Sequence, residues 1–225
     1  MGRTRIKICG IRTPEAALAA VDAGADTIGL VFVPGSPREV SVEQAQVIVE
    51  SLPAMVEPVA LFANESAGRI LSIAKQLNLR TVQLHGKESV EDVLALAPLR
   101  VIKAVAFQPD TFQDTLAIWR SGPANVAAIL VDAPPPAAAQ VTGGHGQAFD
   151  WNSLAQAREQ GLFADLTPIV LAGGLKPENV EQAIRTVRPY AVDVSSGVES
   201  SRGVKDVQLI RAFCAAVRQA DALMG

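Results

Sequence analysis

Short apolar runs alternate with longer amphipathic segments along the whole chain. The apolar runs are rich in β-branched residues and are mostly bounded by Gly, Pro, Asn or Asp, which is typical of β-strands. We predict strands over residues 5–9, 27–33, 56–62, 81–85, 101–107, 126–132, 168–172 and 190–194. The amphipathic segments predict helices over residues 15–23, 42–52, 67–77, 89–97, 112–119, 151–159, 178–187 and 205–222.

Each of the eight predicted strands is followed by a helix, with a repeat of about 28 residues. Repeated strand–helix units imply a parallel α/β sheet with right-handed crossovers, and eight units close naturally into a (β/α)8 TIM barrel. We expect a single domain over residues 1–225, because no linker or composition shift interrupts the series. An open doubly wound sheet is the alternative, but no Gly-x-Gly-x-x-Gly motif follows the first strand.

Composition fits such a core and narrows the classes of function. Hydrophobic residues make up 49% of the chain but aromatic residues only 4%, so Ala, Val, Ile and Leu must fill most of the core. The net charge of −3 argues against a general nucleic-acid-binding protein. Two distant cysteines, Cys9 and Cys214, exclude a disulfide framework and a Cys-rich zinc site. No apolar stretch matches a signal peptide or a membrane span, so we expect a cytoplasmic protein with no membrane contact. Most helical faces have an ordinary amphipathic pattern without a clear interface patch, so we expect no obligate protein partner.

In a barrel of this class, the chemistry belongs at the C-terminal ends of the strands. Alternation in the first strand places Lys7 and Cys9 on the inward face and Ile6 and Ile8 toward the helices. Cys9 then lies near the mouth, where a thiol of lowered pKa can act as an acid or a base; the alternative is a small buried residue. Because closure brings the first and eighth strands together, we also predict a buried Lys7–Asp193 pair, with Lys7 favouring the Cys9 thiolate.

Two other strand ends carry charged candidates. Asp132 directly follows four apolar residues of the sixth strand and can act there as a general acid; alternatively, it initiates the proline-rich turn that follows. Arg38 lies in the proline-bounded loop after the second strand, where its guanidinium group can clamp a carboxylate or a phosphate. The alternative for Arg38 is a solvated loop arginine.

Glycine-rich segments follow the seventh and eighth strands. They contain Gly173 and Gly174 in the first segment, and Ser195, Ser196 and Gly197 in the second. Glycines at such places let the backbone approach a ligand, and barrels often bind phosphate with these two loops. We therefore predict a phosphate site, with ordinary turn glycines as the alternative.

The loop after the sixth strand contains Gly144 and His145, and it can fold over a bound ligand. His85 and His145 are the only histidines of the chain. Two histidines at different strand ends can in principle hold a metal ion, but no third ligand stands out beside them. We therefore expect no metal site, with His85 as a strand-end polar residue and His145 as a loop residue.

Seven segments in order along nearly the whole chain together resemble one family, the phosphoribosylanthranilate isomerases of tryptophan biosynthesis. The segments are Lys7-Ile8-Cys9-Gly10-Ile11, Ser36-Pro37-Arg38, Gln83-Leu84-His85-Gly86, Asp132, Gly143-Gly144-x-Gly146 with Phe149-Asp150-Trp151, Ala172-Gly173-Gly174-Leu175, and Asp193-Val194-Ser195-Ser196-Gly197-Val198-Glu199. The opening cysteine motif combined with the closing Ser-Ser-Gly-Val-Glu motif is the most specific part of the resemblance.

The resemblance implies a (β/α)8 barrel that catalyses an Amadori rearrangement without a cofactor. N-(5-phosphoribosyl)anthranilate, a small phosphoribosyl substrate, becomes its 1-deoxyribulose 5-phosphate isomer. On this resemblance, Cys9 is the general base that removes the proton from C2 of the sugar, and Asp132 is the general acid that protonates the ring oxygen. Arg38 meets the anthranilate carboxylate. The backbone around Gly173–Gly174 and Ser196–Gly197 binds the phosphate.

Two other functions compete with this one. A related phosphosugar isomerase of histidine biosynthesis works with two aspartates, but here the first strand ends in Cys9. A non-catalytic phosphate-binding barrel needs neither Cys9 nor Asp132, so the presence of both argues against it. The chain departs from the family at His145, where Thr or Ser is more common, and its sequence leaves the oligomeric state open.

Overall fold

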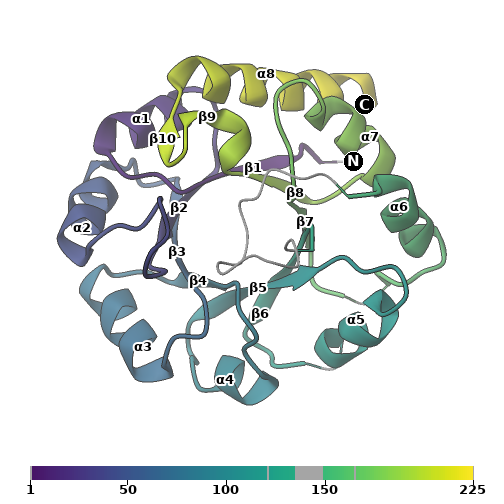
Figure 1. Cartoon of the computed structure of the whole chain (residues 1–225), viewed down its shortest axis with the longest axis horizontal. Coiled ribbons are helices and arrows are strands. Elements are labelled where there is room, and N and C mark those ends of the chain that lie inside the picture. The colour runs from purple at the N-terminus through teal and green to yellow at the C-terminus, as the bar shows by residue number, and fades with distance from the viewer. Residues whose placement is uncertain (1, 121, 135–148, 165, 225) are drawn as a thin grey trace.

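Eight parallel strands close into a barrel that is surrounded by helices in the computed structural model, which describes residues 2–120, 122–134, 149–164 and 166–224 (Figure 1). The strands are β1 (Arg5–Cys9), β2 (Thr27–Val31), β3 (Glu57–Phe62), β4 (Thr81–Leu84), β5 (Arg100–Ala106), β6 (Val126–Asp132), β7 (Ile169–Leu171) and β8 (Ala191–Val194). The predicted (β/α)8 barrel is confirmed, and the open-sheet alternative is wrong.

A helix follows each strand and covers the outside of the barrel. The helices are α1 (Pro14–Asp22), α2 (Val42–Ser51), α3 (Ala67–Gln76), α4 (Val90–Leu94), α5 (Phe112–Arg120), α6 (Trp151–Glu159), α7 (Val180–Val187) and α8 (Val207–Met224). Between β8 and α8 lie a short 3-10 helix η1 (Ser196–Val198) and a hairpin of β9 (Glu199–Ser201) and β10 (Val204–Lys205). No helix within the described residues has the length and apolar character that a membrane crossing requires.

Several predicted elements differ in their bounds from the observed ones. The second strand was expected to reach Val33, but β2 ends at Val31, three residues before Pro34, which cannot donate to a ladder because it has no N–H. The fourth helix was expected over residues 89–97, but it covers only Val90–Leu94, since the chain then turns toward Pro98. The last helix begins at Val207 rather than at residue 205, because the preceding residues form the β9–β10 hairpin.

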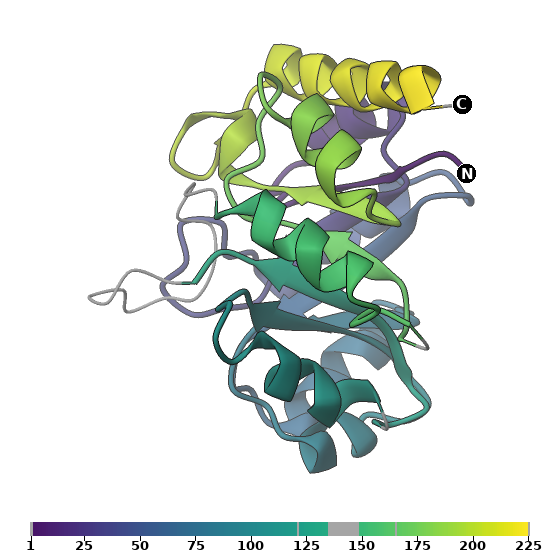
Figure 2. The same ribbon diagram turned by 90° about the vertical axis from the view of Figure 1, so that its right-hand side faces the viewer.

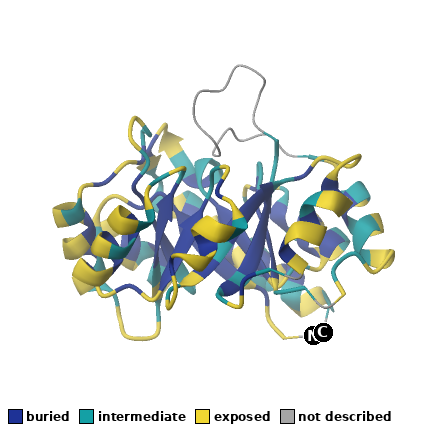
Figure 3. Ribbon diagram, turned by 90° about the horizontal axis from the view of Figure 1, so that it is seen from below, coloured by how far each residue is buried: buried dark blue, intermediate teal, exposed yellow. Residues whose placement is uncertain are grey.

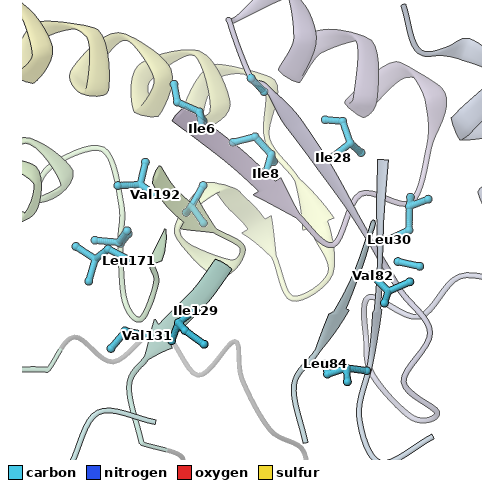
Figure 4. Packing of buried hydrophobic residues seen from close by; sticks show 14 of the residues in the cluster. Ile6, Ile8, Ile28, Leu30, Val82, Leu84, Ile129, Val131, Leu171 and Val192 are labelled. Carbon is cyan, nitrogen blue, oxygen red and sulfur yellow. The ribbon is translucent and has the colours of Figure 1, made fainter. Parts of the chain in front are cut away.

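Two apolar layers hold the barrel together. The larger layer lies between the strands and the helices; it includes Ile6 and Ile8 of β1 and Ile28 and Leu30 of β2, and Figure 4 shows Ile8 between Ile6 and Ile28. A smaller cluster of alanines, valine and leucine fills the inside from β5 to β8. Figure 3 shows the consequence, with buried strands at the centre and exposed outer helix faces.

Barrel closure depends on the pairing of β1 with β8. Lys7 lies directly opposite Asp193 in this parallel pair, and Ile6 lies opposite Val192. Because Ile6 and Val192 belong to the outer layer, alternation turns Lys7 and Asp193 inward. The first and last strands therefore bring two charged residues, 186 positions apart in the sequence, into the interior of the barrel.

Candidate active site

The C-terminal end of β1 has the predicted arrangement. Lys7 and Cys9 are both 4% exposed, and Cys9 packs with Val31 and Leu61 inside the barrel mouth. Lys7 Nζ donates a hydrogen bond to Asp193 Oδ1 at 2.7 Å, and both side chains are buried. The predicted Lys7–Asp193 pair is confirmed.

The local environment acts on the Cys9 thiol in two directions. Burial raises its pKa, because desolvation penalises the thiolate, whereas the charges of Lys7 and Lys205 lower it. The net effect is a raised pKa. Lys7 therefore favours the thiolate as expected, but burial outweighs it. Gly29 makes room for the thiol, since a Cβ at position 29 would lie 2.9 Å from Cys9 Sγ.

Asp132 ends β6 and is only 14% exposed at its side chain. Its Oδ1 accepts a hydrogen bond from the Ala133 N–H at 2.8 Å. Its Oδ2 lies 3.1 Å from His85 Nε2, and Gln83 Nε2 lies 2.9 Å from His85 Nδ1. With the Gln83 amide donating to Nδ1, the neutral ring carries its hydrogen on Nε2 and donates it to Asp132. These contacts place Asp132 at the mouth of the barrel, and its role as a general acid stays a prediction.

His85 is a strand-end polar residue, as predicted, and it directly follows β4. Sequence reasoning missed its contact with Asp132, which lies 47 positions away and on a strand that does not neighbour β4 in the barrel. The available signal was the position of both residues at C-terminal strand ends. No group of three or more His, Cys, Asp or Glu residues able to hold a metal ion occurs in the described part of the chain, which leaves out His145.

Arg38 is buried, so its interpretation as a solvated loop arginine is wrong. Its Nε and Nη2 donate hydrogen bonds to Glu199 Oε1 and Oε2 at 2.7 and 2.9 Å. Lys205 Nζ also contacts Glu199 Oε1, at 2.8 Å. Burial alone would raise the pKa of Glu199, but the Arg38 hydrogen bonds and the Lys205 charge lower it to about 2.

Sequence reasoning missed Glu199 and Lys205 as parts of the site. Glu199 appeared only as the last residue of a motif, and Lys205 was expected in a helix. Instead Lys205 belongs to β10, and its side chain is 2% exposed. Burial lowers the pKa of Lys205, because desolvation outweighs the raising effect of Glu199. A buried lysine in so short a strand has no sequence signal that distinguishes it from a surface lysine.

The glycine-rich ends of β7 and β8 lie beside the other site residues. Gly173 has a φ of +83°, and a Cβ there would lie 2.7 Å from the Ala133 nitrogen and 3.1 Å from Asp132 Oδ1. Gly174, with a φ of +63°, follows it. A Cβ at Gly197 would lie 1.9 Å from the Leu175 carbonyl oxygen, so the loops after β7 and β8 touch at this point.

Ser195 and Ser196 connect β8 to the start of η1. Ser195 Oγ donates a hydrogen bond to the Cys9 carbonyl oxygen at 3.1 Å, which joins the eighth strand end to the first. The structure therefore brings the ends of β1, β6, β7 and β8 and the loop after β2 to one mouth of the barrel. The predicted ligand residue Gly144 lies outside the described residues.

Comparison with known proteins gives a consistent result over almost the whole chain. A family model described as N-(5'-phosphoribosyl)anthranilate (PRA) isomerase matches residues 6–216. The N-(5'-phosphoribosyl)anthranilate isomerase of Acinetobacter calcoaceticus is 43% identical over 220 residues, covering 96% of this chain and 97% of that protein. The protein of the same name from Geobacter metallireducens is 45% identical over 209 residues, covering 93% and 96%.

Solved structures agree with the sequence comparisons. The phosphoribosyl anthranilate isomerase of Thermotoga maritima superposes with a TM-score of 0.83 at 40% identity, covering 96% of this chain and 99% of that one. A phosphoribosyl anthranilate isomerase in complex with reduced 1-(o-carboxyphenylamino)-1-deoxyribulose 5-phosphate superposes with a TM-score of 0.81 at 38% identity, with the same coverage.

Proposed function

Because the chain belongs to the N-(5'-phosphoribosyl)anthranilate isomerase family, we propose that its Cys9 and Asp132 are the general base and the general acid of the family's reaction. The chain is an isomerase of tryptophan biosynthesis that interconverts an aldose and a ketose. Its reaction converts N-(5'-phosphoribosyl)anthranilate into 1-(2-carboxyphenylamino)-1-deoxyribulose 5-phosphate.

The observation that carries the proposal is the placement of one acid and one base around the same mouth. Cys9 ends β1 and Asp132 ends β6, and these strands do not neighbour each other in the barrel. A sugar bound between them would meet the thiol on one side and the carboxyl group on the other. Each proton transfer by a positioned group contributes typically about 10²–10⁴-fold to the rate.

The reaction consists of a ring opening followed by the movement of protons that turns the aldose into the ketose. Asp132 donates a proton to the ring oxygen as the C1–O bond breaks, while the nitrogen lone pair forms a protonated imine with C1. The Cys9 thiolate then removes the C2 proton, and the C–H electron pair forms a C1–C2 double bond as the imine electrons return to nitrogen. Addition of a proton to C1 and loss of the proton from the C2 hydroxyl group, as the C2–O double bond forms, then give the ketose. These steps move protons only, so they need no redox cofactor.

The surroundings of Asp132 suit its role. Proton transfer leaves a carboxylate, which accepts hydrogen bonds from the Ala133 N–H and from His85 Nε2. Both donors are in place before the reaction, so stabilising the new charge needs little reorganisation. The surroundings of Cys9 suit a strong base. Because the pKa of its thiol is raised, the thiolate binds a proton more tightly than an ordinary cysteine thiolate does.

The remaining site residues are proposed to bind the two anionic ends of the substrate. Arg38 meets the anthranilate carboxylate, in agreement with the carboxyphenyl group of the ligand bound by the related structure. The backbone of Gly173, Gly174, Ser196 and Gly197 holds the phosphate. Together with Ser195 beside Cys9 and Gly144 in the loop after β6, they fix the orientation of the sugar.

A fluorescence assay with matched variants tests the roles of Cys9 and Asp132. Substrate generated in situ loses its anthranilate fluorescence on rearrangement, so the wild-type chain quenches it. Cys9→Ala and Asp132→Asn are expected to lower kcat by about 10²–10⁴-fold with an unchanged circular dichroism spectrum. Cys214→Ala, the control, removes the other buried cysteine from α8 and is expected to retain turnover. Wild-type turnover in Cys9→Ala or Asp132→Asn would reject the role of that residue.

The predicted location and partners rest on the sequence alone. We propose that the enzyme acts in the cytoplasm on a small phosphoribosyl substrate and has no obligate protein partner. Cell fractionation and sedimentation of the native enzyme from an extract test these two points. Recovery with the membrane fraction, or in a complex with another protein, would reject them.

A further inference from the structure

A series of buried charges joins the loop after β2 to the β9–β10 hairpin. Arg38 contacts both carboxylate oxygens of Glu199 through Nε and Nη2. Lys205 Nζ contacts Glu199 Oε1 at 2.8 Å, and the Gly203 N–H donates to Glu199 Oε2 at 3.1 Å. The three charged side chains are only 9%, 4% and 2% exposed for Arg38, Glu199 and Lys205. Glu199 therefore lies between two cations and is saturated with donors.

The same series continues to the end of β1. Lys205 Nζ also donates to the Ser195 carbonyl oxygen at 2.8 Å and lies 3.3 Å from Ser195 Oγ. Ser195 Oγ in turn donates to the carbonyl oxygen of Cys9. An unbroken set of contacts thus links the guanidinium group proposed to hold the substrate carboxylate to the strand end that carries the proposed base.

Two glycines make this arrangement close-fitting. A Cβ at Gly10, which has a φ of +78°, would lie 2.6 Å from Arg38 Cδ, so the stem of Arg38 rests directly on the backbone after β1. A Cβ at Gly203, with a φ of +84°, would lie 2.3 Å from the Pro37 carbonyl oxygen. The turn of the hairpin therefore packs on the residue before Arg38. Figure 2 shows the hairpin at the end of the barrel where the loop after β2 also lies.

The contacts leave a defined part of the Arg38 guanidinium group unused. A guanidinium group has five N–H donors, and Glu199 takes one from Nε and one from Nη2. Within the described residues, Nη1 makes no hydrogen bond.

The net charge of the three side chains also matters, because Glu199 alone would cancel the positive charge of Arg38. Lys205 restores it, so that the three side chains together carry one excess positive charge.

We propose that Glu199 and Lys205 are positioning residues that hold Arg38 with Nη1 directed at the substrate carboxylate and keep the group one charge positive. The inference rests on the proposed contact of Arg38 with that carboxylate. Glu199 supplies the geometry, since its two oxygens fix the guanidinium plane. Lys205 supplies the charge. Arg38 is then pre-organised and loses little freedom on binding, and the enzyme selects an aryl amine that carries a carboxylate.

A pair of substrates tests this selection. Ribose 5-phosphate condenses with anthranilate or with aniline, and the two phosphoribosyl amines differ only in the carboxylate. The measured quantity is the ratio of kcat/KM for the anthranilate substrate to that for the aniline substrate, followed by borohydride trapping and chromatography of the ketose. Glu199→Gln keeps the size of the side chain but replaces one acceptor by a donor facing Arg38. It is expected to lower the ratio about 10- to 100-fold, mainly through KM for the anthranilate substrate.

Two further variants separate charge and stability from positioning. Lys205→Gln leaves the Arg38–Glu199 contacts in place but removes the excess charge, so it is also expected to lower the ratio about tenfold. Glu88→Gln is the control, because Glu88 and Lys103 form another buried pair, at 2.8 Å, away from Arg38. Glu88→Gln is expected to lower the melting temperature without changing the ratio.

Arg38→Met distinguishes failure of this inference from failure of the proposed function. If Arg38→Met lowers the ratio while Glu199→Gln and Lys205→Gln leave it at the wild-type value, the positioning role is overturned and the contact of Arg38 stands. If Arg38→Met itself leaves the ratio unchanged, the proposed carboxylate contact fails. A ratio that falls equally in Glu88→Gln also overturns the inference, because loss of stability would then explain the effect.

Discussion

Removing one charge of the buried Lys7–Asp193 pair is expected to destabilise the enzyme much more than removing both charges. The pair closes the barrel, since the two residues lie directly opposite each other on β1 and β8. Its N–O distance is 2.7 Å, and the side chains are 4% and 9% exposed. Lys7→Met leaves Asp193 without any hydrogen bond to its side chain from the described residues. Such a change lowers the free energy of unfolding by about 3–5 kcal/mol, whereas replacing both partners by apolar residues often leaves it unchanged.

The expected magnitude is large enough for a simple thermal assay. For a chain of this length, 1 kcal/mol shifts the melting temperature by about 2–4 °C, so Lys7→Met or Asp193→Leu is expected to lower it by about 6–20 °C. The double variant Lys7→Met/Asp193→Leu is expected to recover most of this loss. An exposed control pair, Arg185 with Glu181, is expected to contribute less than about 0.5 kcal/mol. Equal and small losses in both single variants, with no recovery in the double variant, would refute the argument.

The pair also predicts a pH dependence of definite sign. Burial alone would lower the pKa of Lys7, but the charges of Asp193 and Cys9 and the hydrogen bonding to both groups together raise it more, so the net shift is upward. A pKa that is higher in the folded than in the unfolded state adds stability that is fully present below the unfolded value of about 10.4. This stability is lost as the pH rises toward the folded pKa. At neutral and higher pH, the stability difference between wild type and the double variant is therefore expected to change only above about pH 10, and a change near neutral pH would contradict this assignment.

Three further predictions concern other positions. Burial raises the pKa of Cys214 to about 11, so mass spectrometry after iodoacetamide treatment at pH 8 is expected to find it unmodified in the folded enzyme; rapid modification would contradict its burial. Gly197→Ala would place a Cβ 1.9 Å from the Leu175 oxygen and is expected to raise KM at least about tenfold, unlike Gly68→Ala, which meets no atom within 4 Å; equal KM values would remove Gly197 from the phosphate site. Because the pKa of Cys9 is raised, kcat/KM is expected to keep increasing above about pH 8.5, and a plateau below pH 7.5 would contradict its role as base.

The strands were predictable because their outward faces form a regular apolar pattern. Each strand contributes residues such as Ile6 and Ile8 to the layer under the helices, and the inward residues of β1 then follow by alternation. The strand ends were less accurate. Although β2 ends at Val31, the backbone N–H of Phe32 still donates a hydrogen bond to the Leu61 carbonyl oxygen of β3. The apolar run therefore extends beyond the regular ladder. The apolar pattern does not indicate which residue is the last to form backbone hydrogen bonds with both neighbouring strands.

Cys9 and Asp132 were found because a structural rule restricts the site of a barrel to a few strand ends. The residues that support them were not found, since their partners are far apart in the sequence. Arg38 and Glu199 are separated by 161 positions. The hairpin that brings Glu199 to Arg38 consists of strands of only three and two residues, too short to show a period of two. Buried charges in short irregular segments therefore have the same sequence pattern as surface charges.

The charges around Cys9 explain how a chain with a net charge of −3 can attract an anionic substrate. Three cations and two carboxylates form the two buried ion-pair groups in the described part of this mouth, namely Lys7 with Asp193, and Arg38 and Lys205 with Glu199. One positive charge is left over, and both the Cys9 thiolate and a substrate carboxylate would be stabilised by it. Burial raises the pKa of Cys9, so we expect the thiol to stay protonated at rest. The excess positive charge is therefore available to the substrate carboxylate. A carboxylate bound at Arg38 offsets this charge, so the later ionisation of the Cys9 thiol costs more free energy. The positive charge therefore increases the affinity for the substrate, while the fraction of Cys9 present as thiolate stays low. Weakening the positive charge at Arg38 is expected to change KM more than kcat.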